Sequence, residues 1–124
     1  MKKRMEVKEA IHNEEKLLLK VESLSDEAEN LHAKGQMLAD SDQLAFIYLL
    51  DNGEDFVYLS VPSSFWPALK EAREHNLPVY AVVNGKQIFL QDFHTELDYL
   101  IENIKGNANY GEEMEKKVTD IFQL

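Results

Sequence analysis

Apolar and polar residues alternate through the first part of the chain, with the period of two that is typical of half-buried β-strands. In residues 4–11, Met5, Val7 and Ile11 share one face of the predicted strand, and charged residues take the other. Residues 16–22 alternate in the same way after the polar stretch His-Asn-Glu-Glu. We therefore expect a hairpin that buries one face, Ile11 included, and leaves its other face in solvent.

An Asn-Gly pair at 52–53 separates two strongly apolar stretches, 44–50 and 56–61. Such a pair favours a type I′ turn, which needs a positive φ at both central residues, so the two stretches predict a second hairpin. A turn of two residues places Tyr48 opposite Val57. Both faces of this hairpin are apolar or aromatic, and we expect it to be central in the sheet and covered on both sides.

A second Asn-Gly pair, at 84–85, predicts a third hairpin with Ala81 opposite Ile88. A short strand is expected at 36–39. The charged stretch at 23–34 contains too few apolar residues to distinguish a loop from a short helix that starts at Ser25.

Three other stretches follow the helical period of 3.6 residues. The first comes after the second hairpin and carries Phe65, Leu69 and Ala72 on one face. Ser64 is its expected N-cap, which puts Pro67 in the first turn, where a missing N–H is tolerated.

The other two helices occupy the C-terminal third of the chain. Thr95 is the expected N-cap of the first, whose apolar stripe comprises Leu97, Leu100, Ile101 and Ile104. Gly106 follows at the position that favours a left-handed residue. The last helix is expected from about residue 112 to 122, with its acidic residues at the positive end of the helix dipole.

These elements predict an α+β fold in a single domain that spans residues 1–124. The expected sheet is mainly antiparallel, has six to seven strands and is built from hairpins. One helix lies between hairpins, and two C-terminal helices pack on the sheet. Whether the sheet closes on itself stays open at this point.

The composition narrows the possible functions. The 124 residues include no cysteine and carry a formal net charge of −10. Acidic residues occur in both halves, so the surface is expected to repel phosphate backbones and anionic membranes. No stretch has the pattern of a signal peptide or a membrane span. We expect a cytoplasmic protein that binds neither nucleic acid nor membranes.

The stretch Gly-Asn-Ala-Asn-Tyr-Gly, residues 106–111, has two interpretations. Glycine and asparagine tolerate positive φ and bond to nearby backbone, so a turn between two helices accounts for them without a ligand. Alternatively, the amides of Asn107 and Asn109 and the ring of Tyr110 contact a partner. It is not a phosphate-binding loop, because the Lys-Ser/Thr that such a loop needs is missing.

The stretch Met-Leu-Ala-Asp-Ser-Asp-Gln-Leu-Ala-Phe-Ile-Tyr-Leu-Leu, residues 37–50, and the stretch 99–114 resemble a small uncharacterised protein family of Bacillus-type bacteria, the one that includes YjbL. The resemblance extends over nearly the whole chain. It implies a cytoplasmic protein of one domain and about this length. The family has no known activity, so the resemblance implies no site residue.

The residues that most often perform chemistry show no convincing pattern. His12, His32, His75 and His94 lack the spacing of a metal-binding motif. The Asp-Ser-Asp at 40–42 is not followed by the glycine and glutamate of a calcium loop, and a turn before a strand accounts for it. We therefore assign no catalytic, cofactor-binding or metal-ligating residue, expect no cofactor, and favour a protein without enzymatic activity.

Our leading hypothesis is a non-catalytic protein–protein interaction module. The candidate contacts are Trp66, Asn107, Asn109 and Tyr110, because an exposed tryptophan is a typical interface anchor. For Trp66 we favour core packing over exposure, since large aromatic residues are mostly buried. One alternative is a small-molecule-binding domain or small enzyme with a pocket between sheet and helices, to which His94 would contribute. The other is a homodimeric structural protein that pairs through a sheet edge.

Overall fold

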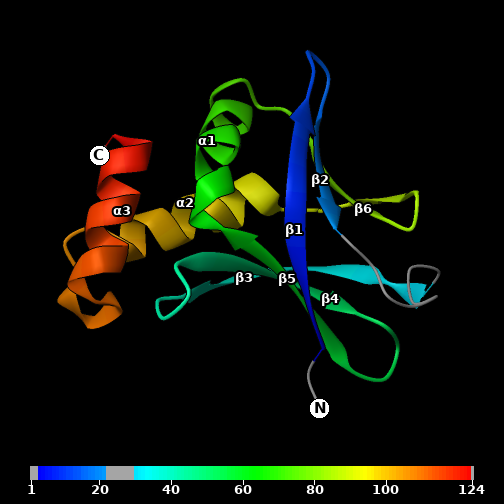
Figure 1. Ribbon diagram of the computed structural model, residues 1–124, viewed down its shortest axis with the longest axis horizontal. Helices are drawn as coiled ribbons and strands as arrows, with labels where there is room; N and C mark the ends of the chain where they lie inside the picture. Colours follow the sequence, from blue (N-terminus) through cyan, green and yellow to red (C-terminus); the bar gives the residue numbers. More distant parts are fainter. Residues whose placement is uncertain (1–2, 22–29, 124) are drawn as a thin grey trace.

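A computed structural model of the chain describes residues 3–21 and 30–123 (Figure 1). The strands are β1 (Lys3–His12), β2 (Leu17–Val21), β3 (His32–Asp40), β4 (Ala45–Asp51), β5 (Phe56–Pro62), β6 (Val79–Val83) and β7 (Lys86–Phe89). The helices are α1 (Trp66–Glu74), α2 (Phe93–Ile104) and α3 (Glu112–Phe122), and short 3₁₀ turns cover Ser63–Phe65 and Ala108–Tyr110. The part of the undecided stretch 23–34 that precedes residue 30 lies outside the described residues.

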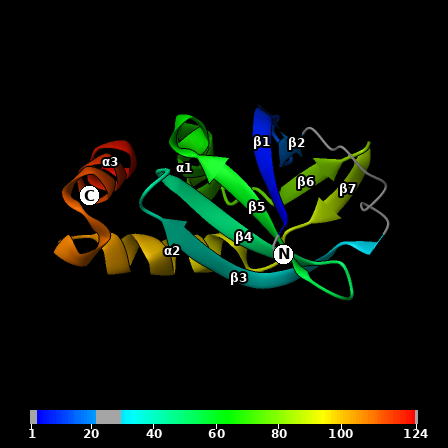
Figure 2. The same cartoon turned by 60° about the horizontal axis from the view of Figure 1, so that its bottom comes forward.

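The seven strands form one mixed sheet in the order β3-β4-β5-β1-β2-β6-β7. The α+β class and the three predicted hairpins are confirmed. The β1–β2 hairpin lies between β5 and β6, and its two strands pair with them in parallel, whereas all other neighbours are antiparallel. In both views α3 lies on the opposite side of the molecule from β6 and β7 (Figures 1 and 2).

The sheet curls until the region after β7 meets the edge of β3. The Tyr48 hydroxyl donates to the Gln91 carbonyl oxygen at 2.6 Å and accepts from the Gly35 N–H at 3.1 Å. The Gln91 side chain donates to the Ala33 carbonyl oxygen, and the Glu96 carboxylate accepts from a second N–H of β3, that of Met37. Side chains therefore occupy this edge of the sheet, which leaves less of β3 for pairing with another strand.

The first hairpin contains a β-bulge that the alternation did not predict. The register of β1 against β2 shifts between Val7 and Glu9, so one extra residue lies on β1. Since successive side chains alternate between faces, the bulge reverses the orientation of all later residues. Val7 is buried as expected, but Ala10 packs against the core and Ile11 points outward. The prediction that Ile11 is buried was wrong.

The two Asn-Gly hairpins differ in how well their register was predicted. At 84–85 the predicted pairing of Ala81 with Ile88 is confirmed. In the other hairpin Tyr48 pairs with Leu59, two residues further along than predicted. The side-chain oxygen of Asn52 accepts the N–H groups of the two residues that follow Gly53, and a loop of four residues results.

Two predicted helix caps were wrong. Neither α1 nor α2 has a side-chain hydrogen bond at its N-cap. A 3₁₀ turn precedes α1, so Ser64 lies before the helix, while Pro67 does occupy the first turn. Helix α2 begins at Phe93, after Asp92 in a left-handed conformation, and Thr95 is its third residue.

The inner face of the sheet and the three helices enclose the main core. Its centre is an aromatic cluster in which Trp66 of α1 stacks on Phe46 of β4 at 4.3 Å, with Phe122 of α3 beside both rings. The apolar stripe predicted for α2 is buried in this core. The helices are thus fixed to the sheet by residues from distant parts of the chain.

The second hairpin is covered on its outer face as well, by side chains. Ala45, Ile47 and neighbouring apolar residues form a small buried cluster there. Arg4 of β1 donates to the Ser60 hydroxyl and to the Asp40 carboxylate, each at 2.9 Å. Burial works to raise the pKa of Asp40, but its hydrogen bonds with Arg4 and with the N–H of Gln43 outweigh this and hold the pKa below its ordinary value. Asp40 therefore closes the turn before β4, as expected for the Asp-Ser-Asp stretch.

Candidate functional site

Four apolar side chains form a continuous row across the outer face of four strands. Ile11 of β1 pairs with Leu18 of β2, Leu18 pairs with Tyr80 of β6, and Tyr80 pairs with Phe89 of β7. We call these four residues the outer row. Their sequence neighbours, such as Leu17 and Ala81, are buried on the inner face, so the alternation of the strands places the row on the side away from the core.

The outer row is open to solvent at both ends. Phe89 is 52 % exposed and Ile11 is 38 % exposed, while Leu18 and Tyr80 are half-buried between them. The rings of Tyr80 and Phe89 lie 5.4 Å apart and support each other. A contiguous apolar row on a sheet face that no described helix covers is typical of a contact surface.

Charged residues lie on both sides of the row. Lys16 and Lys20 share the outward orientation of Leu18 and precede and follow it by two residues. The Lys16 ammonium lies 5.2 Å from the centre of the Tyr80 ring and donates to the side-chain oxygen of Gln87. Glu9 faces Lys20 across the hairpin. The surface therefore offers apolar area with two ammonium groups and one carboxylate beside it.

Sequence reasoning missed this surface. The sequence of β2 did indicate that Leu18 faces outward. Leu18 alternates in phase with Lys16 and Lys20, which belong to the face of the predicted hairpin that was expected to lie in solvent. The predicted pairing of Ala81 with Ile88 also implied that Tyr80 faces Phe89, as the structure shows. The alternation did not predict the bulge that turns Ile11 outward, and it did not predict the parallel pairing that places β2 beside β6.

Trp66 lies in the core, which is the location that the sequence favoured over an exposed one. Its side chain is 0 % exposed, and its indole N–H donates to the Val61 carbonyl oxygen at 3.0 Å. A side chain in this position offers no surface to a partner, so Trp66 does not qualify as an exposed anchor.

The residues of the 106–111 turn are largely used by the turn itself. The side-chain oxygen of Asn107 accepts from the N–H of Asn109 at 3.0 Å, and its amide donates to the Asn103 carbonyl oxygen at 3.2 Å. Tyr110 packs against the core, and the Asn109 side chain is exposed. A partner contact at Asn107, Asn109 and Tyr110 stays a prediction.

The local role of Asn107 can be measured. We expect Asn107→Ala to lower the free energy of unfolding by about 0.5–2 kcal/mol, because it removes a capping oxygen. Asn109→Ala, which removes an exposed amide, should change it by less than about 0.5 kcal/mol. Urea unfolding curves of the two variants check this. Equal losses would mean that the turn does not depend on the Asn107 side chain.

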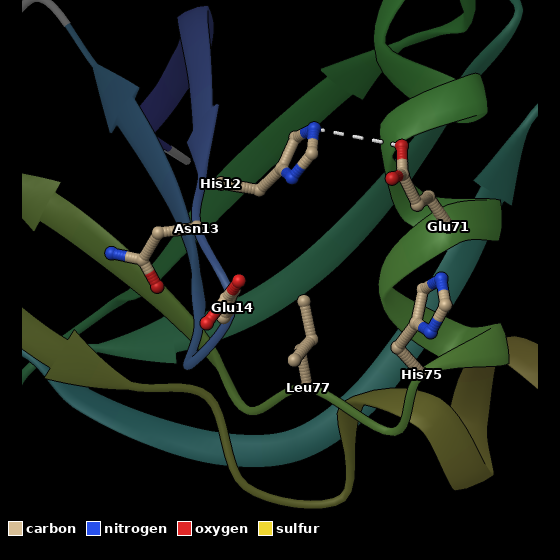
Figure 3. A pocket seen from close by; sticks show the side chains of 6 residues that line it. All are labelled: His12, Asn13, Glu14, Glu71, His75 and Leu77. Carbon is tan, nitrogen blue, oxygen red and sulfur yellow. Dashed lines mark ion pairs between the residues drawn. The ribbon is translucent and has the colours of Figure 1, made fainter.

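A cleft of about 510 Å³ lies between the β1–β2 turn and the end of α1 (Figure 3). Glu14 comes from the turn, Glu71 comes from α1, and His75 directly follows that helix. His12 Nε2 lies 3.5 Å from the Glu71 carboxylate, and Leu77 contributes an apolar wall. The cleft is open and its charged side chains are largely exposed, so it lacks the enclosed environment that perturbs catalytic groups.

A second cleft, of about 330 Å³, lies where β6 and β7 meet the start of α2. His94 and Asp92 are among its lining residues, which partly matches the alternative of a pocket between sheet and helices. However, His94 Nε2 is 2.6 Å from the Leu77 carbonyl oxygen, and its Nδ1 is buried, with no hydrogen-bond partner among the described residues. The histidine therefore binds the loop before β6 through Nε2, and its second nitrogen is shielded from solvent.

Residues 3–21 and 30–123 contain no group of three or more histidine or acidic side chains that could hold a metal ion. In the same ranges, no helix is long and apolar enough to span a membrane.

The sequence matches the family described as "Family of unknown function (UPF0738)" over residues 5–122. A UPF0738 protein of Bacillus pumilus is 45 % identical over 122 residues, which cover 98 % of this chain and 99 % of the relative. The UPF0738 protein YjbL of Bacillus subtilis is 43 % identical with the same coverage. A relative from Anoxybacillus flavithermus is 52 % identical over 95 residues, covering 77 % of this chain and 70 % of the relative. No solved structure gives a significant match.

Proposed function

Because the chain belongs to the UPF0738 family, whose function is unknown, we propose its function from its own surface: it is a non-catalytic protein–protein interaction module that binds through the outer row. The match to this family confirms the family resemblance seen in the sequence.

The observation that carries the proposal is the alignment of the row. Four side chains from two hairpins that are far apart in the sequence lie opposite one another, strand by strand, on a face that no described helix covers. Aromatic residues are enriched in protein interfaces, and the row contains two of them. Its ends, Ile11 and Phe89, are among the few large apolar residues that the described part of the chain exposes.

The rival function, binding of a small molecule, draws on the two clefts. In the first, the acidic and histidine side chains are exposed, and in the second, His94 is engaged by the Leu77 carbonyl oxygen. Ligand sites are usually enclosed and have polar groups that converge inside, so both clefts support the rival less well than the row supports an interface. The acidic composition fits our further expectation of a cytoplasmic location.

Site-specific photo-crosslinking tests the proposal. A photoreactive phenylalanine analogue would replace Phe89, or Tyr99 on α2 as a more exposed aromatic control, in the full chain produced in Bacillus subtilis. Tyr99 is 69 % exposed and lies outside the outer row. We expect a discrete crosslinked product from position 89 and little from position 99. The same analogue at Asn109 tests the predicted contact at the turn.

A second change makes the result specific. Leu18→Lys places a charge in the middle of the row without touching the core, and it should abolish the product from position 89 while the thermal unfolding midpoint stays the same. Equal crosslinking at positions 89 and 99, or a product that Leu18→Lys leaves intact, would contradict the proposed surface.

A further inference from the structure

We propose that the outer row binds an extended segment of another protein in which an apolar residue lies between two acidic residues, four positions apart, in the pattern acidic-x-apolar-x-acidic. This inference rests on the proposed function and specifies its partner. Three features of the surface support it: the spacing of two lysines, the lack of an ion pair between either lysine and an acidic side chain among the described residues, and the small area of the row.

The spacing comes from strand geometry. Lys16, Leu18 and Lys20 face outward from the same stretch of chain. At about 3.3 Å per residue, the two lysine backbones lie on the order of 13 Å apart, with the outer row crossing midway between them. An extended ligand has the same repeat, so side chains at its positions 1, 3 and 5 can face Lys16, the row and Lys20 in turn.

The charges favour a partner that carries carboxylates. Among the described residues, neither lysine forms an ion pair with an acidic side chain. Glu9 is the acidic residue that pairs with Lys20 in the register, and it leaves the three groups with a net positive charge on a chain of net charge −10. Opposite charges at the edge of an apolar contact determine which partners are accepted more than they add affinity.

A second copy of this chain fits the surface less well. The exposed parts of the four side chains amount to an area on the order of 300 Å², since a large aromatic side chain offers about 150–250 Å² when fully exposed. A stable interface buries about 800 Å² on each partner. Two copies would also bring Lys16 and Lys20 toward the same lysines, and like charges in contact oppose binding.

Short blocked peptides test the inference directly. The probe is acetyl-Ser-Glu-Ser-Phe-Ser-Glu-Ser-amide, and the control replaces both glutamates by lysine. A second control keeps the composition but moves the glutamates next to the phenylalanine. Titrations of the full ¹⁵N-labelled chain are followed by NMR. We expect the strongest shifts at Leu18, Lys20, Tyr80 and Phe89, and a Kd about tenfold lower for the probe than for the lysine peptide, which corresponds to about 1.4 kcal/mol from two ion pairs.

The double variant Lys16→Glu/Lys20→Glu should reverse the preference, because both charges change sign while the apolar row stays intact. Equal affinity for the three peptides, or shifts that map elsewhere, would overturn the inference. So would sedimentation that shows a dimer dissociated by Phe89→Lys, since the occupant would then be a second copy. The peptide titrations test only the ligand pattern. The proposed function is tested separately by crosslinking at position 89 with the natural partner, so failure of one can be distinguished from failure of the other.

Discussion

Replacing Trp66 by alanine is expected to lower the free energy of unfolding by about 3–5 kcal/mol, the largest effect of any change considered. The indole is fully buried, stacks on Phe46 and lies beside Phe122. Its loss opens a cavity where a strand and two helices meet, and it leaves the Val61 carbonyl oxygen without its donor. For a chain of this length the midpoint of thermal unfolding should fall on the order of 10–20 °C, as circular dichroism would show.

Two further variants make the test of Trp66 decisive. Trp66→Phe keeps a ring against Phe46 but removes the N–H donor, so it should lose clearly less stability than Trp66→Ala. It also provides a folded variant if the alanine variant does not fold, because domains of this kind are stable by only about 5–15 kcal/mol. Tyr99→Ala, an exposed control on α2, should stay within about 0.5 kcal/mol of the native chain. A midpoint that Trp66→Ala lowers by less than about 2 °C would contradict its place in the core.

The elements of the fold could be predicted from the sequence because each is specified locally. The Asn-Gly pair at 84–85 takes up both positive-φ positions of a two-residue turn, and the pairing follows from it. The pair at 52–53 begins with an asparagine whose side chain accepts two backbone N–H groups, and this favours a longer loop. Identical dipeptides therefore gave one correct and one shifted register, and the shift by two residues kept every side chain on its predicted face.

What could not be predicted depends on contacts between distant segments. The bulge between Val7 and Glu9 has no sequence signal in the alternation, yet it decides that Ile11 faces outward. The parallel pairing of β2 with β6 brings together strands separated by some sixty residues. The outer row depends on both the bulge and this parallel pairing. Hydrophobic periodicity therefore identified the strands that carry its residues but did not predict that these residues are neighbours. Trp66 shows the converse, because its size alone favoured burial over a partner contact, and its packing in the core agrees with that prediction.

Replacing Tyr48 by phenylalanine is expected to lower the free energy of unfolding by about 1–3 kcal/mol, although only one oxygen atom is lost. That hydroxyl accepts from the N–H of Gly35 and donates to the carbonyl oxygen of Gln91, and so it joins β3 to the chain after β7. Both backbone groups lose their partner in the variant. Tyr99→Phe is the matched control, because the same atom is removed from an exposed ring, and it should be neutral within about 0.5 kcal/mol.

The role of the Tyr48 hydroxyl also predicts how the effect of this substitution changes with pH. Burial raises the pKa of Tyr48 to about 12, from an ordinary value of 10.0. Between these two values the unfolded chain has released the proton while the folded chain retains it, so this group's contribution to stability falls as the pH rises. The difference in free energy of unfolding between the native chain and Tyr48→Phe should therefore be constant up to about pH 9 and shrink toward about pH 12. The other tyrosines are common to both proteins and cancel in the comparison. Urea titrations at several pH values measure this difference, and a difference that stays constant to about pH 11.5 would show that the hydroxyl titrates as it does in water and does not link the two edges of the sheet.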